Sequence, residues 1–290
     1  MTAHPAGPRG RIRRATPLPH SDPYTLSSSD LERQQSHFGV TANQVEHDFA
    51  VSHILHAISP LSDKFVFYGG TALSRTHLAG LRLSEDIDLL AISARSNTAA
   101  LIDLAIVRSL ERHFDGVAGN PSLQDARTDT EACIYQVGNS QVKIQLIDGR
   151  DYVAWPTQQS HVSMRYDGIN DVTMTTLTPD GFACAKLAAW SDPTRNAPRD
   201  LYDLWAMSDR GFITAETARL FKTHGPTGGY PREWMLPRHA PTNDEWHGSL
   251  GHQCLPEVGP DEAHEQVTAA WLEATAEAES SSGNSSSMVG

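Results

Sequence analysis

The 290-residue chain is poor in cysteine and has no long apolar run. Its three cysteines, Cys133, Cys184 and Cys254, are odd in number and far apart, which argues against a disulfide framework and favours a reducing compartment. No segment approaches the roughly 20 consecutive apolar residues that a membrane-spanning helix requires. We therefore expect a cytoplasmic protein without a membrane segment.

Positive charge is also scarce, because 23 Lys and Arg stand against 35 Asp and Glu, a net charge of −12. Such an acidic chain does not coat nucleic acid over its whole surface, although a local basic groove is compatible with the total. Two nucleotide-binding motifs are missing as well: the G-x-G-x-x-G of dinucleotide domains and the Gly-Lys-[Ser/Thr] of the Walker loop.

The composition of the two ends differs from that of the middle. Residues 1–29 are rich in Pro, Ser, Thr and Arg without periodicity, and residues 280–290 are rich in Ser, so we expect a disordered leader and a disordered tail. Between them we expect an α/β core over residues 30–172 and a helical C-terminal domain over residues 173–279. From Leu255 onward the chain has seven acidic residues and no Lys or Arg, a pattern that fits a solvated helix face as well as an interaction surface.

Periodicity and capping signals predict the individual elements. A capping box at Thr41 to Gln44 precedes a helix that ends near Ile58, and Gly80 closes a second helix. Strands are expected at 65–68 and 86–90, followed by a hairpin of 131–137 and 141–147. The predicted helices cover residues 41–58, 71–78, 97–114, 182–190, 199–207, 214–222, 242–250 and 261–279.

A pair of aspartates in the second predicted strand indicates chemistry. Side chains alternate along a strand, so Asp86 and Asp88 point to the same side while Ile87 points to the other. Two carboxylates on one face repel each other and desolvate poorly, and divalent metal ions such as Mg²⁺ offset both costs. An exposed edge strand with outward aspartates explains the same pattern and is the more frequent case for an isolated D-x-D.

The preceding strand ends in Gly69 and Gly70 and leads into a helix. Glycines at such a turn let the backbone approach a ligand closely, and the N–H groups of a helix start suit phosphate oxygens. A tight turn or a dinucleotide-type glycine turn is the alternative. A diglycine strand end with an aspartate pair one helix later fits a triphosphate with a metal ion better than a dinucleotide.

Four spaced motifs over residues 38–205 resemble the AbiEii/AbiGii toxin family of nucleotidyltransferases, which includes the MenT toxins and belongs to the DNA polymerase beta-like superfamily. They are VEHDF at 45–49, GGTAL at 69–73 followed by RLSEDIDLL at 82–90, CAKL at 184–187, and PRDLYDL at 198–204. The resemblance implies a minimal nucleotidyltransferase core of α/β (α+β) class, a mixed sheet flanked by helices, followed by a helical C-terminal part.

The resemblance also implies roles for individual residues. Asp86 and Asp88 would bind two Mg²⁺ ions, and Lys186 and Asp203 would act with them in catalysis. Residues that would bind the nucleotide are Gly69, Gly70, Thr71, Ser84, Arg199 and Asp200. From the residues alone, Lys186 could equally be a lysine whose head reaches solvent, and Arg199, Asp200 and Asp203 a surface ion-pair group on one helix face.

The implied reaction is transfer of a nucleoside monophosphate from an NTP to an acceptor hydroxyl, such as the 3′ end of tRNA. Toxin–antitoxin or phage-defence function and a cognate antitoxin follow from the same resemblance.

One departure stands out: the superfamily usually has a third carboxylate on a later strand, where this chain has Gln145. Because glutamine accepts no proton, either another group serves as the base or the metal-bound hydroxyl needs none. Asp148, on the opposite face of a regular strand, and Glu131 are the other carboxylates to consider. A catalytically degenerate nucleotide-binding protein is the second hypothesis. A dinucleotide binder, suggested by Gly69 and Gly70 alone, is a third.

Overall fold

The computed structural model describes residues 22–195 and 198–286. These residues form one seven-stranded sheet in the order β3-β4-β5-β2-β1-β7-β6. The two central strands, β1 (Phe65–Tyr68) and β2 (Ile87–Ala91), are antiparallel, whereas β2 with β5 (Ser140–Asp148) and β1 with β7 (Val172–Leu177) are parallel pairs. The remaining strands, β3 (Gly119–Asn120), β4 (Cys133–Val137) and β6 (Thr157–Val162), are antiparallel to their neighbours. The sheet is mixed, as predicted.

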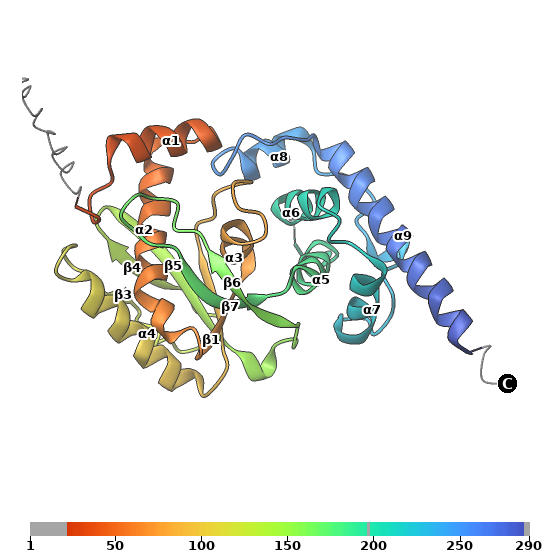
Figure 1. Ribbon diagram of the computed structural model, residues 1–290, viewed down its shortest axis with the longest axis horizontal. Coiled ribbons are helices and arrows are strands. Elements are labelled where there is room, and N and C mark those ends of the chain that lie inside the picture. The colour runs from red at the N-terminus through yellow and green to blue at the C-terminus, as the bar shows by residue number, and fades with distance from the viewer. Residues whose placement is uncertain (1–21, 196–197, 287–290) are drawn as a thin grey trace, which may run out of the picture.

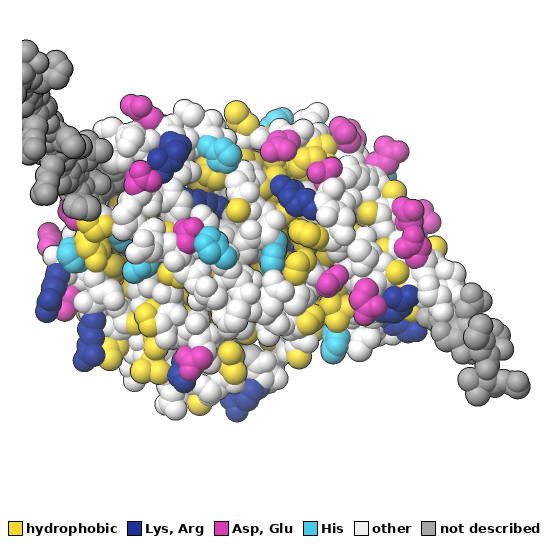
Figure 2. Space-filling model, viewed as in Figure 1, with side chains coloured by type: hydrophobic (Ala, Val, Ile, Leu, Met, Phe, Trp, Pro, Cys, Tyr) yellow, Lys and Arg dark blue, Asp and Glu magenta, His cyan; other side chains and the backbone are white. Residues whose placement is uncertain are grey.

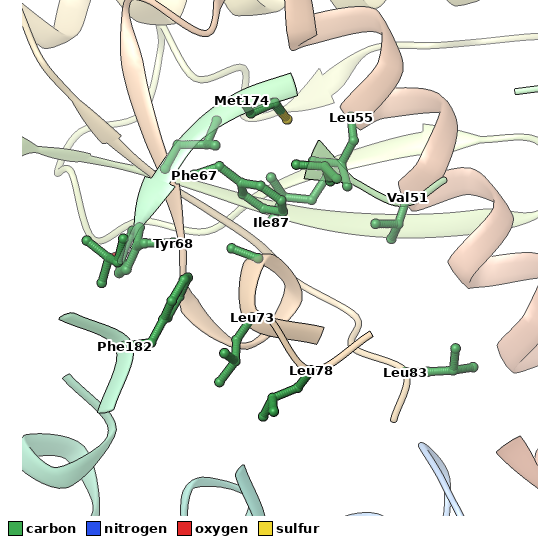
Figure 3. Packing of buried hydrophobic residues seen from close by; sticks show 14 of the residues in the cluster. Val51, Leu55, Phe67, Tyr68, Leu73, Leu78, Leu83, Ile87, Met174 and Phe182 are labelled. Carbon is green, nitrogen blue, oxygen red and sulfur yellow. The ribbon is translucent and has the colours of Figure 1, made fainter. Parts of the chain in front are cut away.

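Helices α2 (Ala42–Ile58) and α4 (Arg95–Leu110) lie together against the sheet (Figure 1). The side chains of Val51 and Leu55 on α2 face Phe67 and Ile87 of the central strands (Figure 3), and all four are fully buried. The short helix α3 (Gly69–Arg75) follows β1 directly. Burying this apolar layer, at about 1.5–3 kcal/mol per large side chain, provides much of the driving force that holds β1 and β2 in place.

Five helices follow the sheet and group at one end of it (Figure 1). They are α5 (Pro179–Trp190), α6 (Pro198–Asp209), α7 (Ala215–His224), α8 (Asn243–Leu250) and α9 (Pro260–Ser286). Thr178, Thr214 and Thr242 cap α5, α7 and α8 through hydrogen bonds to backbone N–H groups. The fold therefore has the predicted α/β class, with a mixed sheet flanked by helices and a helical C-terminal part.

Sequence patterns missed several elements. Helix α1 (Ser28–Phe38) begins inside the predicted leader, capped by Ser27, and α9 continues past residue 279 into the predicted tail. The edge strand β6 is polar, which hides its alternation, but β-branched Val172, Thr173, Thr175 and Thr176 could have indicated β7. The sequence predicts that the helical part begins at residue 173. Because β7 occupies this segment and pairs with β1, the helical part begins instead with α5. Residues 1–21 of the leader and 287–290 of the tail lie outside the described residues.

The acidic C-terminal segment is an exposed helix face. Its acidic side chains gather along α9 (Figure 2), and the exposed ones include Asp261, Glu265 and Glu273. Val267 and Trp271 on the opposite side are fully buried. No helix within the described residues is long and apolar enough to cross a membrane. The three cysteines are all free and buried.

His53 on α2 lies in a cluster of aromatic side chains. Its ring stacks on Tyr24 at 5.1 Å and meets Phe49 edge-on at 4.5 Å, while its neighbour His56 is exposed. Among the described residues, no hydrogen-bond partner reaches the buried Nε2 atom of His53. Burial lowers the pKa of His53 to about 4.

This shift predicts acid-sensitive stability. The unfolded chain binds a proton on His53 near pH 6.5, whereas the folded protein does so only near pH 4, so stability falls as pH drops between these values. The loss is at most about 3 kcal/mol. The stability difference between pH 7 and pH 5, measured by denaturant unfolding, should be smaller for His53→Gln than for wild type. The control His239→Gln changes an exposed histidine and should show the same difference as wild type. An equal pH dependence in all three proteins would contradict the assignment.

Candidate active site

A cleft of about 510 Å³ opens where β1, β2 and β5 meet helix α5 and the start of α6. Eight of the ten residues that the sequence singled out line it. They are Gly69, Gly70, Ser84, Asp86, Asp88, Lys186, Arg199 and Asp200. Segments far apart in the chain thus converge on one cavity, because β2 lies between β1 and β5 in the sheet.

The two aspartates lie at the start of β2 and both face the cleft. Asp86 precedes the strand with a half-exposed side chain, and Asp88 lies deeper, opposite Tyr68 in the β1–β2 register. Burial first, and the negative charge of Asp86 second, raise the pKa of Asp88 to about 6. The fold holds two repelling carboxylates together on one wall, the costly arrangement that a metal ion would relieve.

The donor chemistry fits a hard divalent cation. Asp86 and Asp88 offer carboxylate oxygens, and Mg²⁺ is commonly bound by one or two carboxylates together with substrate phosphates and water. Within the described ranges, no group of three or more His, Cys, Asp or Glu side chains forms a complete metal cage. The remaining ligands would therefore have to come from a substrate and water.

Gly69 is required by the position of Asp88. Its φ of +76° is a left-handed conformation, and the Asp88 carboxylate occupies the space where a Cβ would project. Gly70 is similarly crowded, since Arg82 Nη2 lies 2.9 Å from where its Cβ would be. The diglycine thus lets the start of α3 approach the aspartate and arginine side chains closely.

Replacing Gly69 by Ala should therefore move Asp88. We expect a stability loss of about 1–2 kcal/mol from the left-handed conformation and a fall in activity of at least about tenfold from the displaced carboxylate. Gly211→Ala is the matched control, because Gly211 has a φ of +71° with nothing within 4 Å of its added Cβ. It should lose similar stability and keep its activity. Equal activity in both variants would show that the approach of Asp88 is unimportant.

Thr71, predicted to bind nucleotide, does not line the cleft. Its side chain is buried, its hydroxyl donates to the Asp86 carbonyl, and its Oγ1 lies 2.9 Å from Ser84 Oγ. Thr71 therefore fixes the backbone ahead of β2, while Ser84 reaches the cleft from the same loop. We revise its role from ligand contact to support of Asp86.

A buried ion-pair network forms the opposite wall. Lys186 Nζ lies 2.7 Å from Asp200 Oδ1 and 2.7 Å from Asp203 Oδ2. Arg82 makes a two-pronged contact with Asp203, with Nε and Nη2 each 2.7 Å from a carboxylate oxygen. Lys186, Asp200 and Asp203 are buried, which corrects the solvent-reaching lysine and the surface ion pair, whereas Arg199 on the same helix is exposed.

Asp203 lies behind this wall rather than in it. It is 2% exposed and does not line the cleft, whereas Lys186, Asp200 and Arg82 do. Burial alone would raise its pKa, but Arg82 and Lys186 hold the pKa of Asp203 at about 2. Burial alone would lower the pKa of Lys186, but the carboxylates of Asp200 and Asp203 raise the pKa of Lys186 above its usual value. Asp203 stays ionised and orients the two cations that face the cleft.

Several lining residues had no sequence signal strong enough to place them. Arg82, Lys143 and Arg195 add positive charge, and Tyr68 and Tyr152 place two rings 5.3 Å apart on the wall. Arg82 could have been found because a charged residue between two leucines, in a segment leading to the aspartates, indicates burial with a partner. The other residues depend on the strand register and the loop before α6.

Gln145 occupies the position predicted for a third carboxylate. It pairs with Asp88 in the parallel β2–β5 register and lines the cleft. Its amide nitrogen donates to the Thr130 carbonyl at 2.9 Å. Lys143, two residues earlier on β5, lies with its Nζ 3.0 Å from Asp86 Oδ2. The strand beside the aspartates thus carries an amide and an ammonium group.

A mixed sheet, a diglycine strand end, an adjacent aspartate pair and cations on the facing helices define the class of nucleotidyltransferases. The model of the family described as nucleotidyl transferase AbiEii toxin, type IV toxin–antitoxin system, matches residues 53–249. This chain belongs to that family. It is a nucleotidyltransferase of the toxin–antitoxin type, and the dinucleotide-binding hypothesis is withdrawn.

Solved structures show the same fold. MenT4, a nucleotidyltransferase toxin from Mycobacterium tuberculosis H37Rv, is similar with a TM-score of 0.60 and 18% identity, over 85% of this chain and 89% of that one. JHP933 from Helicobacter pylori is similar with a TM-score of 0.50 and 16% identity, over 86% and 99% of the two chains. No curated protein matches the sequence.

Proposed function

We propose that this protein transfers a nucleoside monophosphate from an NTP, with Mg²⁺, to the 3′ hydroxyl of a tRNA. The observation that supports it is the convergence of Asp86 and Asp88 on one wall with Lys186 and its network on the other, around a cleft of about 510 Å³. Carboxylates suit a metal ion and the cations suit phosphate oxygens, so the two walls together match a metal-bound triphosphate.

Each wall has a distinct part in binding. Asp86 and Asp88 would hold Mg²⁺, which when bound would supply positive charge to the phosphates and to the attacking oxygen. Lys186, Arg195 and Arg199 contact the triphosphate, and Tyr152 offers a ring on which a nucleobase stacks. The acceptor oxygen bonds to the α-phosphorus, the bond to the bridging oxygen breaks, pyrophosphate leaves, and the hydroxyl proton passes to water.

The biological setting follows from the family. We infer a cytoplasmic toxin whose modification of tRNA arrests growth or limits phage infection until a cognate antitoxin neutralises it. Binding of tRNA by a chain with net charge −12 requires a local cationic surface, and Lys143, Arg195 and Arg199 at the cleft provide the start of one.

Comparing two positions of radiolabel tests the proposal. Each of the four NTPs, labelled at the α- or the γ-phosphate, is incubated with the protein, total tRNA and Mg²⁺. We expect α-label, but no γ-label, to enter RNA with at least one NTP, and chelation of Mg²⁺ by EDTA to stop it. Binding of NTP without transfer to any RNA would instead support the degenerate nucleotide-binding hypothesis that Gln145 suggests.

A further inference from the structure

Lys143 forms an ion pair with Asp86, one of the two carboxylates that would have to hold a second metal ion. In the β2–β5 register Gln145 stands beside Asp88, and Lys143 Nζ reaches Asp86 Oδ2 at 3.0 Å. The strand that would supply a third carboxylate therefore supplies a positive charge instead. Two divalent ions 3.5–4 Å apart generally need more carboxylate oxygens than Asp86 and Asp88 can offer once one of them is paired to an ammonium group.

Stability does not account for this pair. The side chains of Lys143 and Asp86 are 40% and 43% exposed, and half-exposed ion pairs contribute little to folding. Lys186 and Arg82 differ, because both are buried and held by Asp200 and Asp203. Lys143 is thus a cation that contacts the aspartate pair itself while its head stays within reach of a ligand in the cleft.

We propose that Lys143 supplies the second positive charge at the aspartate pair, so that the site takes one divalent ion with the triphosphate instead of two. The proposal rests on the proposed function and replaces the two-ion arrangement that the sequence predicted. An ammonium group can neutralise and hydrogen-bond phosphate oxygens as a point charge, which is the electrostatic part of what a second ion does. Gln145, its amide nitrogen engaged by Thr130, adds no charge.

Counting bound Mn²⁺ is the direct test. Electron paramagnetic resonance of the full-length protein saturated with inorganic tripolyphosphate and Mn²⁺ should show one Mn²⁺ per protein without spin coupling. The double variant Lys143→Ala/Gln145→Asp, which exchanges the cation for a third carboxylate, should bind two coupled Mn²⁺ ions. Two coupled ions in the wild-type protein would overturn the proposal.

Kinetics of Lys143→Gln give an independent test if the double variant does not fold. Losing a competing cation should tighten Mn²⁺ binding severalfold with the count still at one, while kcat falls at least about tenfold and Lys143→Arg recovers part of it. Lys64→Gln is the matched control, since Lys64 forms an exposed pair with Asp63 at 2.6 Å outside the cleft. Lys64→Gln should change neither the Mn²⁺ affinity nor kcat.

The outcomes separate this proposal from the proposed function. Tighter Mn²⁺ binding with kcat preserved in Lys143→Gln would mean that the lysine only holds the place of a second ion, and would overturn the proposal. A wild-type protein that transfers α-label and binds two Mn²⁺ would contradict the single ion while leaving nucleotidyl transfer established. A protein that transfers no label to any acceptor would contradict the proposed function itself.

Discussion

Replacing Asp88 by Asn is expected to abolish nucleotidyl transfer, with a loss of at least about a thousandfold, because the variant loses one of the two carboxylates that would hold the proposed metal ion in the cleft. Asp86→Ala should have a comparable effect. Steady-state transfer of α-labelled nucleotide measures both. Asp63→Asn, which removes an exposed aspartate outside the cleft, should retain full activity.

The Asp88→Asn substitution should not lower the stability of the fold. Burial and the charge of Asp86 oppose ionisation of Asp88, so removing that charge in the metal-free protein relieves repulsion. We expect the free energy of unfolding of Asp88→Asn at pH 8 to be unchanged or higher by up to about 2 kcal/mol. Loss of activity together with a clear loss of stability would mean that Asp88 is a structural residue.

Asp203→Asn should differ from Asp88→Asn in stability, because it should lose both activity and stability. Its carboxylate accepts from Arg82 and contacts Lys186, and breaking such a buried ion-pair network costs about 3–5 kcal/mol because the cations are left without a full counter-charge. Lys186 and Arg82 would then shift in the cleft, and we expect transfer to fall by at least about a hundredfold. Thermal unfolding and transfer rates measured together test this.

Two comparisons keep the interpretation of Asp203 specific. Asp209→Asn changes an exposed aspartate at the end of the same helix and should leave both values unchanged. Lys186→Ala should lose transfer as Asp203→Asn does, and Lys186→Arg should recover only part of it because a planar fork replaces a point charge. An Asp203→Asn protein with wild-type stability would contradict the buried network.

The helices and the central strands could be predicted because local signals fix them. The capping box at Thr41, the apolar run before Gly69 and the two-residue period of Asp86 and Asp88 each depend on a few neighbouring residues. Edge strand β6 has mostly polar residues, so only its pairing with β7 defines it. Helix α1 buries the polar residues Asp30 and Gln34 together with Phe38, so it has no continuous apolar face for a periodicity pattern to detect.

The site residues also differ in whether local or long-range contacts place them. Gly69, Asp86 and Asp88 are close in sequence, so a strand–turn–helix pattern brings them together. The contact of Arg82 with Asp203 joins residues 121 positions apart, and that of Lys143 with Asp86 joins residues 57 positions apart. Burial of Asp203 depends on the packing of α6 against α5 and on the contact with Arg82, which no local pattern encodes. The sequence therefore identified the charged residues, whereas Asp203 and Thr71, which the resemblance placed in the site, do not line the cleft.

The intact mass of the acceptor RNA tests the central claim most directly. Purified tRNA incubated with Mg²⁺, the NTP that gives label transfer, and wild-type protein should gain the mass of one or more nucleoside monophosphates at its 3′ end. The Asp63→Asn protein should give the same product, and the Asp88→Asn protein should leave the RNA mass unchanged. A mass gain of equal extent with Asp88→Asn would show that the cleft around Asp86 and Asp88 is not where nucleotidyl transfer takes place.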